Sequence, residues 1–216
     1  MKALYEIQET FRERNKIIVF GCGGHARSVV NAIHGINSGM EIILVDPNAE
    51  DNEVILGCRV EREYEMEESD GYIIAVGDNQ KRQELYRQIQ EKNRGLCVSI
   101  VSRQAIAGTD VKIDQGAFIA PGAYIGPQAE IGCNSVINTG SIVEHETIIG
   151  NHTHIAPGVT ICGRCKIGNY VFCGAGSTVI DEVSICDQVV IGAGAVVITD
   201  IYEAGTYVGV PAKKVR

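Results

Sequence analysis

Residues 117–143 read AFIAPGAYIGPQAEIGCNSVINTGSIV, and within this stretch a large apolar residue returns at every sixth position. The spacing continues in both directions, because all fifteen positions at six-residue intervals between 113 and 197 are apolar. At the chain's hydrophobic content of 45%, chance would produce such a run in roughly a few of a hundred thousand trials. The positions are Ile113, Ile119, Ile125, Ile131, Ile137, Val143, Ile149, Ile155, Ile161, Ile167, Cys173, Val179, Ile185, Ile191 and Val197.

A second series, two residues before the first, consists of small or β-branched residues such as Ala117, Ser135 and Val159. Two inward positions separated by one outward position describe a very short β-strand, because side chains alternate across a strand. Such a repeat predicts a β-helical solenoid for residues 105–216, in which each coil covers the next. The apolar position is often followed by a glycine, expected to supply permissive torsions at a corner, as at Gly126, Gly132, Gly150, Gly168 and Gly192.

The first 104 residues have a different hydrophobic pattern, without the six-residue repeat. The stretch KIIVFGCGGHARSVVNAIHG, residues 16–35, reads as a strand, a glycine turn and a helix. EIILVD and GYIIAVGDN predict two further strands, and QKRQELYRQIQEKN predicts an amphipathic helix. This alternation is typical of a small parallel sheet with helices around it. Leu4, Ile7 and Phe11 suggest an additional N-terminal helix.

The glycine turn has the spacing of a dinucleotide-binding motif. Gly21, Gly23 and Ala26 open the predicted helix, and Asp46 ends the next strand. A helix N-terminus offers N–H donors and a favourable dipole to a pyrophosphate, and Asp46 is placed to accept a hydrogen bond from a hydroxyl. The sheet region is too short for a complete dinucleotide fold, so it predicts a nucleotide diphosphate site and argues against a redox enzyme. A purely structural turn is the alternative.

Three of the five histidines lie between residues 138 and 158. In the six-residue frame His145 lies at an exposed corner between Glu144 and Glu146, and His154 points outward from a strand. His152 is expected to be a solvated corner residue. An imidazole beside a carboxylate is suited to general-base chemistry near neutral pH. His145 and His154 are nine residues apart, or one and a half repeats, so if both act at one site we expect them to meet across a subunit boundary.

Composition excludes several classes of protein. The formal net charge is −8, which argues against nucleic acid or a membrane surface as a partner. The chain contains no apolar run long enough to span a bilayer, and its charged N-terminal residues lack the apolar centre expected of a signal peptide. Its eight cysteines lack disulfide-framework spacing, so we expect free thiols and a cytoplasmic protein. Cys162 and Cys165 look like half of a zinc site, but Cys165 occupies an inward position and is interpreted as structural.

The solenoid pattern, with the closing GVPAKKVR at residues 209–216, resembles the hexapeptide-repeat acyltransferases, whose coils form left-handed triangular prisms. The N-terminal motifs are similar to those of the sialic acid O-acetyltransferase family, which includes UDP-amino-sugar N-acetyltransferases of the PglD type. The resemblance implies a Rossmann-like α/β domain, residues 1–104, that binds the nucleotide-sugar acceptor. The implied binding residues are Gly23, Gly24, His25, Asp46, Pro47 and Gly77.

The same resemblance assigns the general base to His145 and the supporting carboxylate to Glu146. It places acetyl-CoA, the acetyl donor, against His154, Ala175 and Ala193, and implies a homotrimer with clefts between prisms. The expected activity is N-acetylation of a nucleotide-linked amino sugar, such as a UDP-4-amino-4,6-dideoxy sugar, without a metal ion. The alternatives are O-acetylation of sialic acid or a related sugar, a metalloenzyme like the γ-class carbonic anhydrases, and a non-catalytic nucleotide-sugar sensor.

Overall fold

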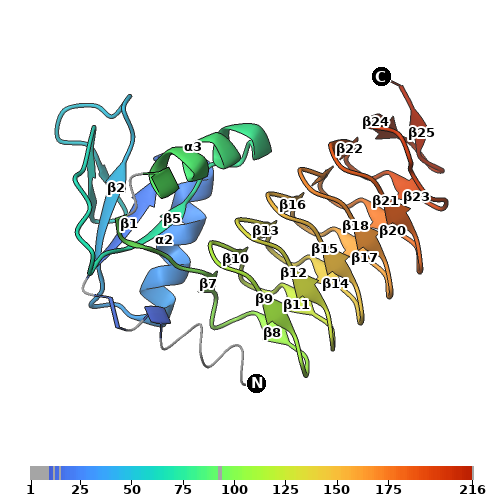
Figure 1. The fold of residues 1–216 in the computed structure, drawn as a ribbon, viewed down its shortest axis with the longest axis horizontal. Helices are drawn as coiled ribbons and strands as arrows, with labels where there is room; N and C mark the ends of the chain where they lie inside the picture. Colours follow the sequence, from blue (N-terminus) through green and yellow to red (C-terminus); the bar gives the residue numbers. More distant parts are fainter. Residues whose placement is uncertain (1–9, 12, 15, 92–93, 216) are drawn as a thin grey trace.

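The computed structural model describes residues 10–11, 13–14, 16–91 and 94–215. It contains a small α/β sheet followed by a long parallel solenoid that extends away from it to the C-terminus (Figure 1). Of the residues that suggested an N-terminal helix, Leu4 and Ile7 lie outside the described residues, whereas Phe11 is buried in the core beside the sheet. No helix in the described part of the chain is long and apolar enough to cross a membrane.

The predicted parallel sheet is confirmed, with strand order β3-β4-β2-β1-β5-β6 and only the β3–β4 pair antiparallel. Its strands read as continuous apolar runs because helices cover both faces. Ile17 and Val19 pack in the core that includes α2, and Ile18 and Phe20 pack in the core that includes α3. The elements are β1 (Lys16–Phe20), α2 (Gly24–Ile36), β2 (Glu41–Val45), β3 (Val54–Ile55), β4 (Cys58–Glu61), β5 (Gly71–Ile74), α3 (Asn79–Glu91) and β6 (Leu96–Cys97).

The solenoid is a left-handed β-helix whose strands stack into three parallel sheets. Partners are eighteen residues apart, as in the pairing of Ile119 with Ile137 and of Ile137 with Ile155. Its strands are β7 (Ile100–Val101), β8 (Ile106–Ala107), β9 (Lys112–Ile113), β10 (Phe118–Ile119), β11 (Tyr124–Ile125), β12 (Glu130–Ile131), β13 (Val136–Ile137), β14 (Ile142–Val143), β15 (Ile148–Ile149), β16 (His154–Ile155), β17 (Thr160–Ile161), β18 (Lys166–Ile167), β19 (Phe172–Cys173), β20 (Thr178–Val179), β21 (Ser184–Ile185), β22 (Val189–Ile191) and β23 (Val196–Val197).

The six-residue series forms the solenoid core. Of its fifteen members every one except Ile113 is at most 3% exposed. At the far end, β24 (Gly205–Val208) pairs in parallel with β22 and in antiparallel fashion with β25 (Lys213–Lys214), which covers the last coil. The domain boundary predicted at residues 104/105 stays a prediction, since β7 lies before it and already pairs with β10.

The expected reason for the corner glycines was wrong. Gly132 and Gly150 have ordinary backbone torsions, and the left-handed residues lie two positions later, for example Asn134 (φ 52°) and His152 (φ 54°). Glycine is required because the next coil passes too close for a side chain. A Cβ atom on Gly132 would lie 2.7 Å from the carbonyl carbon of Gly150, and one on Gly150 would lie 2.5 Å from that of Gly168.

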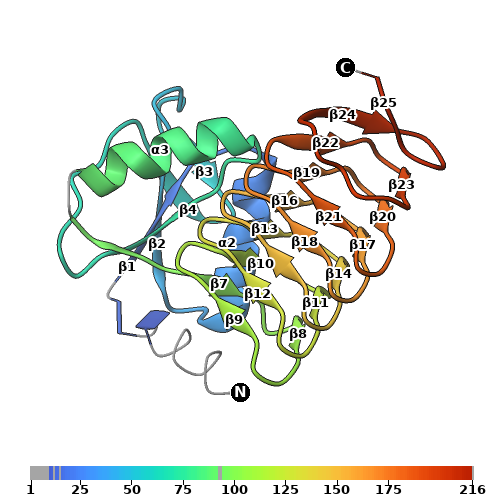
Figure 2. The same cartoon turned by 45° about the vertical axis from the view of Figure 1, so that its right-hand side comes forward.

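The N-terminal part docks on one face of the solenoid through α2, which lies between the sheet and the coils in both views (Figure 2). Outward residues of β7, β10 and β13, namely Ile100, Phe118 and Val136, are buried in the same cluster as Val29 and Ile33 of α2. The two parts therefore share one apolar core, which fixes the edge of the sheet relative to the coils.

Adjacent residues Ile148 and Ile149 test this packing. Ile149 points inward and is 1% exposed, whereas Ile148 points outward and is 42% exposed. We expect Ile149→Ala to lower the free energy of unfolding by about 2–5 kcal/mol, because it leaves a cavity that rigid neighbouring coils cannot fill. Ile148→Ala, the matched control, should cost less than about 1 kcal/mol. Equal losses for the two variants in urea denaturation would contradict the inward assignment.

Candidate functional site

The parallel sheet brings the six predicted acceptor-site residues to one edge. Strands β2, β1 and β5 are adjacent, so the segments that follow their carboxyl ends are neighbours. Gly23, Gly24 and His25 follow β1, Asp46 and Pro47 follow β2, and Gly77 follows β5. Ligands of open α/β sheets bind at such an edge.

The start of α2 is open to an anion. Gly23 is its N-cap residue and makes no side-chain capping hydrogen bond. Both Gly23 and Gly24 are exposed, and a Cβ atom on either would meet nothing within 4 Å. The unpaired N–H groups of a first helical turn attract a phosphate. The space beside Gly23 and Gly24 is therefore open to such a group.

Asp46 is an ionised carboxylate that shapes the neighbouring turn. Burial alone would raise the pKa of Asp46, but hydrogen bonds from Asn48 and from Cys22 outweigh it and lower the pKa. One oxygen accepts from the main-chain N–H of Asn48 at 3.0 Å, and the other accepts from the main-chain N–H of Cys22 at 3.2 Å. Oδ1 also accepts from the side-chain amide of Asn48 at 3.3 Å. A carboxylate has about four lone-pair sites, so a ligand hydroxyl would bind at Oδ2, which accepts the bond from Cys22.

The ring of His25 faces the solenoid. Its centroid lies 5.3 Å from that of Phe118 and 6.0 Å from that of His154. Burial, helped by His154 and Arg82, lowers the pKa of His25 to about 3. The ring is therefore neutral and packs between the two parts of the chain. Any ligand contact of His25 at this edge would come from its main chain in the first turn of α2.

His154 points outward from β16 as predicted, but the N-terminal part covers it. The side chain is 7% exposed, and Nδ1 donates to the carbonyl oxygen of Gly77 at 3.0 Å. Nε2 lies 3.2 Å from the Asn138 side-chain amide, which donates to it. Burial lowers the pKa of His154 to about 4, and the hydrogen bond to Gly77 opposes that shift. A neutral imidazole thus joins the turn after β5 to the solenoid.

The expectation that His152 is solvated was wrong. It is 9% exposed, and its ring stacks on Tyr170 with centroids 5.3 Å apart and planes 10° apart. Nδ1 lies 3.0 Å from the amide nitrogen of Asn134, and Tyr86 of α3 packs edge-on against the ring. The six-residue pattern locates the corner correctly but contains no information about the helix that covers it.

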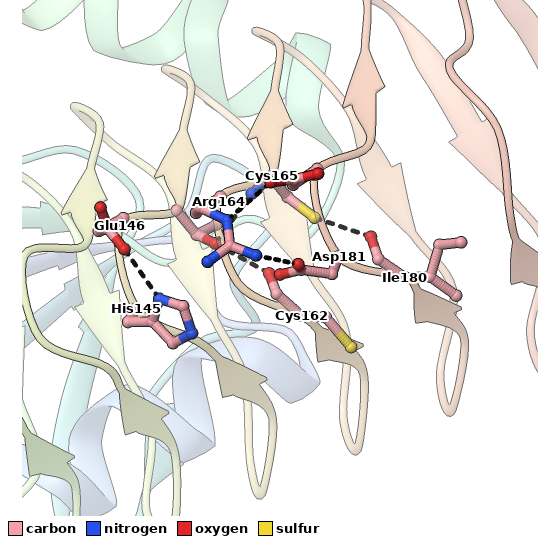
Figure 3. Close-up of polar contacts among 9 residues, drawn as sticks. His145, Glu146, Cys162, Arg164, Cys165, Ile180 and Asp181 are labelled. Carbon is pink, nitrogen blue, oxygen red and sulfur yellow. Dashed lines mark hydrogen bonds and ion pairs between the residues drawn. The ribbon is translucent and has the colours of Figure 1, made fainter.

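His145 and Glu146 lie together at an exposed corner between β14 and β15 (Figure 3). Nδ1 of His145 lies 3.0 Å from Glu146 Oε2, and the two side chains are 43% and 53% exposed. The carboxylate accepts a hydrogen bond only from a protonated Nδ1, so the neutral ring carries its basic lone pair on Nε2. An exposed imidazole in this tautomer can accept a proton from a bound reactant.

Gly163, one coil further along, provides the space that His145 occupies. A Cβ atom at position 163 would lie 2.6 Å from both Cε1 and Nε2 of the ring. Beyond it, Arg164 makes an ion pair with Asp181 and a second with Glu182 at 3.0 Å. The imidazole therefore lies against the backbone of Gly163. Figure 3 shows the ion pair between Arg164 and Asp181 in the same region.

Ala175 and Ala193 stack at a different corner, which follows the sheet that contains β16. The main-chain N–H of Gly176 donates to Pro157 at 3.0 Å, and that of Gly194 donates to Ala175 at 2.9 Å. Thr139, Pro157, Ala175 and Ala193 form a column of compact residues on successive coils. One chain therefore does not bring His145 together with this column, because the β11-β14-β17 sheet separates the two corners.

A cleft of about 470 Å³ opens beside Gly77 that sequence reasoning missed. Its walls include Asp78 from the N-terminal part and Tyr170, Phe172 and Val190 from the solenoid. The sequence pattern does not show that the outward residues of β19 and β22 line a cleft, because the opposite wall is a turn far away in the sequence. Arg82, which is buried between the two parts, was missed for the same reason.

The two inward cysteines of the solenoid, Cys165 and Cys173, are buried and structural. Burial raises the pKa of Cys165 to about 11 and that of Cys173 to about 12. The Cys165 thiol donates to the carbonyl oxygen of Ile180 at 3.1 Å. Within the described ranges, no group of three or more His, Cys, Asp or Glu side chains is arranged to hold a metal ion.

The buried histidines predict loss of stability in acid. The folded-state pKa is about 3 for His25 and about 4 for His152 and His154, against about 6.5 in an unfolded chain. The unfolded chain binds these protons first, so the stability contributed by the neutral rings is complete above about pH 6.5 and is lost toward pH 4. We expect the free energy of unfolding to fall through this window by up to about 1.4 kcal/mol per pH unit for each ring.

NMR titration of the rings checks this directly. The chemical shifts of these three histidines should not change between about pH 8 and 5.5. His154→Gln keeps a donor and an acceptor but removes one titrating group, so it should flatten the dependence of stability on pH. A ring that protonates with a midpoint near 6.5 would contradict the assignment.

Comparison with known proteins agrees with this arrangement. Residues 16–89 match the PglD N-terminal domain, and residues 128–163 match the bacterial transferase hexapeptide (six repeats). None of the curated proteins compared with the chain matches it. The acetyltransferase domain of PglB from Neisseria gonorrhoeae FA1090 superimposes with a TM-score of 0.87 at 24% identity, covering 94% of this chain and 100% of that one.

Two structures from Caulobacter crescentus are more similar in sequence. PerB in complex with CoA and GDP-perosamine is 28% identical, with a TM-score of 0.82 over 93% of this chain and 97% of that one. A histidine-to-asparagine variant of perosamine N-acetyltransferase, also with CoA and GDP-perosamine, is 26% identical with a TM-score of 0.83 and the same coverage. The chain thus carries a PglD N-terminal domain followed by bacterial transferase hexapeptide repeats, and over nearly its whole length it is similar to solved sugar N-acetyltransferases.

Proposed function

We propose that the protein is an acetyl-CoA-dependent N-acetyltransferase that acts on the amine of a nucleotide-linked amino sugar. The observation that carries the proposal is the pairing of His145 with Glu146 at an exposed corner, with Nε2 free to accept a proton. The open start of α2 and the ionised Asp46 support an acceptor that is bound through its nucleotide diphosphate. Solved relatives with CoA and GDP-perosamine bound support both substrate classes.

In the proposed reaction the acceptor amine attacks the thioester carbonyl carbon, forming a C–N bond. Nε2 of His145 takes the proton that the nitrogen loses, and Glu146 stabilises the imidazolium. The C–S bond then breaks, and the imidazolium returns the proton to the departing sulfur, so CoA leaves as a thiol. The buried thiols of Cys165 and Cys173 are protonated at neutral pH, which favours direct transfer over an acyl-cysteine intermediate.

We place acetyl-CoA along the column of Thr139, Pro157, Ala175 and Ala193, whose compact side chains leave room for an extended pantetheine arm. His154 would border this groove, since its Nε2 reaches Asn138 next to Thr139. Both ring nitrogens of His154 are already engaged, so the polar contacts of the thioester would come from elsewhere.

We place the acceptor at the edge formed by Gly23, Gly24, His25, Asp46, Pro47 and Gly77, with the nucleotide diphosphate at the start of α2. This edge faces the sheet of β10, β13 and β16, whereas His145 lies at the opposite end of the β11-β14-β17 sheet. A complete site therefore needs His145 from another copy of the chain, and we propose a homotrimer with the sites between prisms. A fully active monomer in analytical ultracentrifugation would contradict this.

The activity is tested by incubating the protein with acetyl-CoA and candidate acceptors while CoA thiol release is followed. We expect release with UDP- or GDP-linked 4-amino sugars and an N-acetylated product by mass spectrometry. The matching 4-hydroxy nucleotide sugars are the controls and should give only background. Release with sialic acid but with no amino-sugar nucleotide would overturn N-acetylation in favour of O-acetylation.

The base assignment is tested by a double-mutant cycle. His145→Ala should lower turnover by about a hundredfold or more, the usual contribution of acid–base catalysis. Gly163→Ala keeps the basic residue but places a methyl group where the ring lies, so it should cost about tenfold or more through misplacement. Its thermal stability should stay near wild type, because the clashes are with the ends of two side chains, the His145 ring and the Asp181 carboxylate at 2.8 Å, and not with backbone.

In the His145→Ala background, Gly163→Ala should cost little further turnover, because no ring is left to displace and only the Asp181 carboxylate is still in close contact. Gly35→Ala is the control, since a Cβ atom there meets nothing within 4 Å. Additive losses in the double variant would show that Gly163 acts independently of His145.

A further inference from the structure

Arg82 is an unusual buried cation. It lies on α3, its side chain is fully buried, and none of the ion pairs among the described residues includes it. Burial lowers the pKa of Arg82 to about 10, with a small opposing effect from Asp78, so the guanidinium stays charged at neutral pH. Burying a charge without a counter-ion is costly, and a neutral residue would avoid the cost. The hydrogen bonds of Arg82 explain why a guanidinium is needed.

Each of the five N–H groups of Arg82 has an acceptor. Nε donates to Asn134 O at 2.9 Å; Nη1 donates to Val76 O at 3.0 Å and Gly77 O at 3.2 Å. Nη2 donates to Asn79 Oδ1 at 2.7 Å and His152 O at 2.8 Å. A guanidinium is the side-chain group that carries five donors in a rigid plane.

These acceptors come from two different places. Val76 and Gly77 belong to the turn between β5 and α3, and Asn79 is the first residue of α3, whereas Asn134 and His152 occupy the same corner on successive coils. Arg82 therefore joins the turn to two coils at once.

Two other side chains hold the same turn. His154 Nδ1 donates to Gly77 O, which also accepts from Arg82. Asn79 Nδ2 donates to Val171 O at 2.9 Å. We call the hydrogen bonds of Arg82, Asn79 and His154 to this turn and to the coils the clamp. The carbonyl oxygens of Val76 and Gly77 accept hydrogen bonds within it. Gly77 and Asp78 also line the cleft shared with Phe172.

We propose that Arg82 is a positioning residue, which sets the place of the acceptor by fixing residues 76–79 to the coils that carry the acetyl donor. This inference rests on the proposed function. Gly77 borders the acceptor edge, and the donor column begins on the coils that Arg82 and His154 contact. A shift of the turn by about 1 Å would change the distance between amine and thioester enough to cost up to a hundredfold in rate.

The test compares Arg82→Met, Arg82→Lys and the control Arg87→Met. Arg87 lies on the same helix but is exposed and paired with Glu84 and Glu91. We expect Arg82→Met to lower kcat/KM for the acceptor by about tenfold or more, with the KM for acetyl-CoA within about twofold of wild type. Arg82→Lys supplies three donors for five acceptors, so its kcat/KM for the acceptor should lie between the values of Arg82→Met and wild type. Arg87→Met should match wild type.

If kcat/KM falls equally for the acceptor and for acetyl-CoA and the melting temperature also falls, Arg82 only stabilises the fold and the proposal is overturned. Unchanged kcat/KM for the acceptor in both Arg82 variants would also overturn it. If Arg82→Met does not fold, Arg82→Lys decides between these outcomes. If the wild-type protein acetylates no nucleotide-linked amino sugar, the proposed function fails, and hydrogen exchange tests the clamp alone. Exchange in residues 76–82 should then be faster in Arg82→Lys than in Arg87→Met, and equal rates would overturn the clamp.

Discussion

The stacking of one coil on the next is the constraint on which the rest of the structure depends. Each short strand within the solenoid, apart from those at its two ends, is hydrogen-bonded to strands eighteen residues before and after it, as in the pairings of Ile137. Such a coil is therefore not complete without its neighbours. The corners pass so close that the carbonyl carbon of Gly150 would lie 2.7 Å from a Cβ atom on Gly132. Residues at equivalent corners consequently form straight columns, and two of these columns carry the chemistry proposed for the protein.

One column contains His145, Gly163 and Asp181. The repeat determines that they are stacked, and the residue types determine that an imidazole lies over a glycine beside an ion pair. The other contains Thr139, Pro157, Ala175 and Ala193, whose side chains are all compact. Because a triangular prism keeps its corners apart, the two columns of one chain cannot serve one thioester. The proposed assembly follows from that rigidity.

The contact between the sheet and the solenoid has an apolar part and a part made of buried hydrogen bonds, and the hydrogen bonds favour one relative placement of the two. Its apolar part, where α2 meets the outward residues of β7, β10 and β13, holds the parts together but does not dictate a unique register. The hydrogen bonds of Arg82, Asn79 and His154 are directional, and unpaired acceptors in a buried interface are costly. A slipped arrangement would leave several carbonyl oxygens without partners, which favours one placement of the acceptor edge.

The sequence by itself determined the solenoid, its inward residues and the parallel sheet, because each depends on a period or a turn visible within a few neighbouring residues. It also brought out the Glu144-His145-Glu146 corner, since adjacent residues on a tight turn must be neighbours in space. Only the tertiary structure decided that His152 is buried, that His154 binds Gly77, and that Arg82 spans two coils. The partners in those contacts lie between 52 and 77 residues apart along the chain. Their meeting depends on how α2 and α3 dock on the coils, and no local pattern encodes that docking.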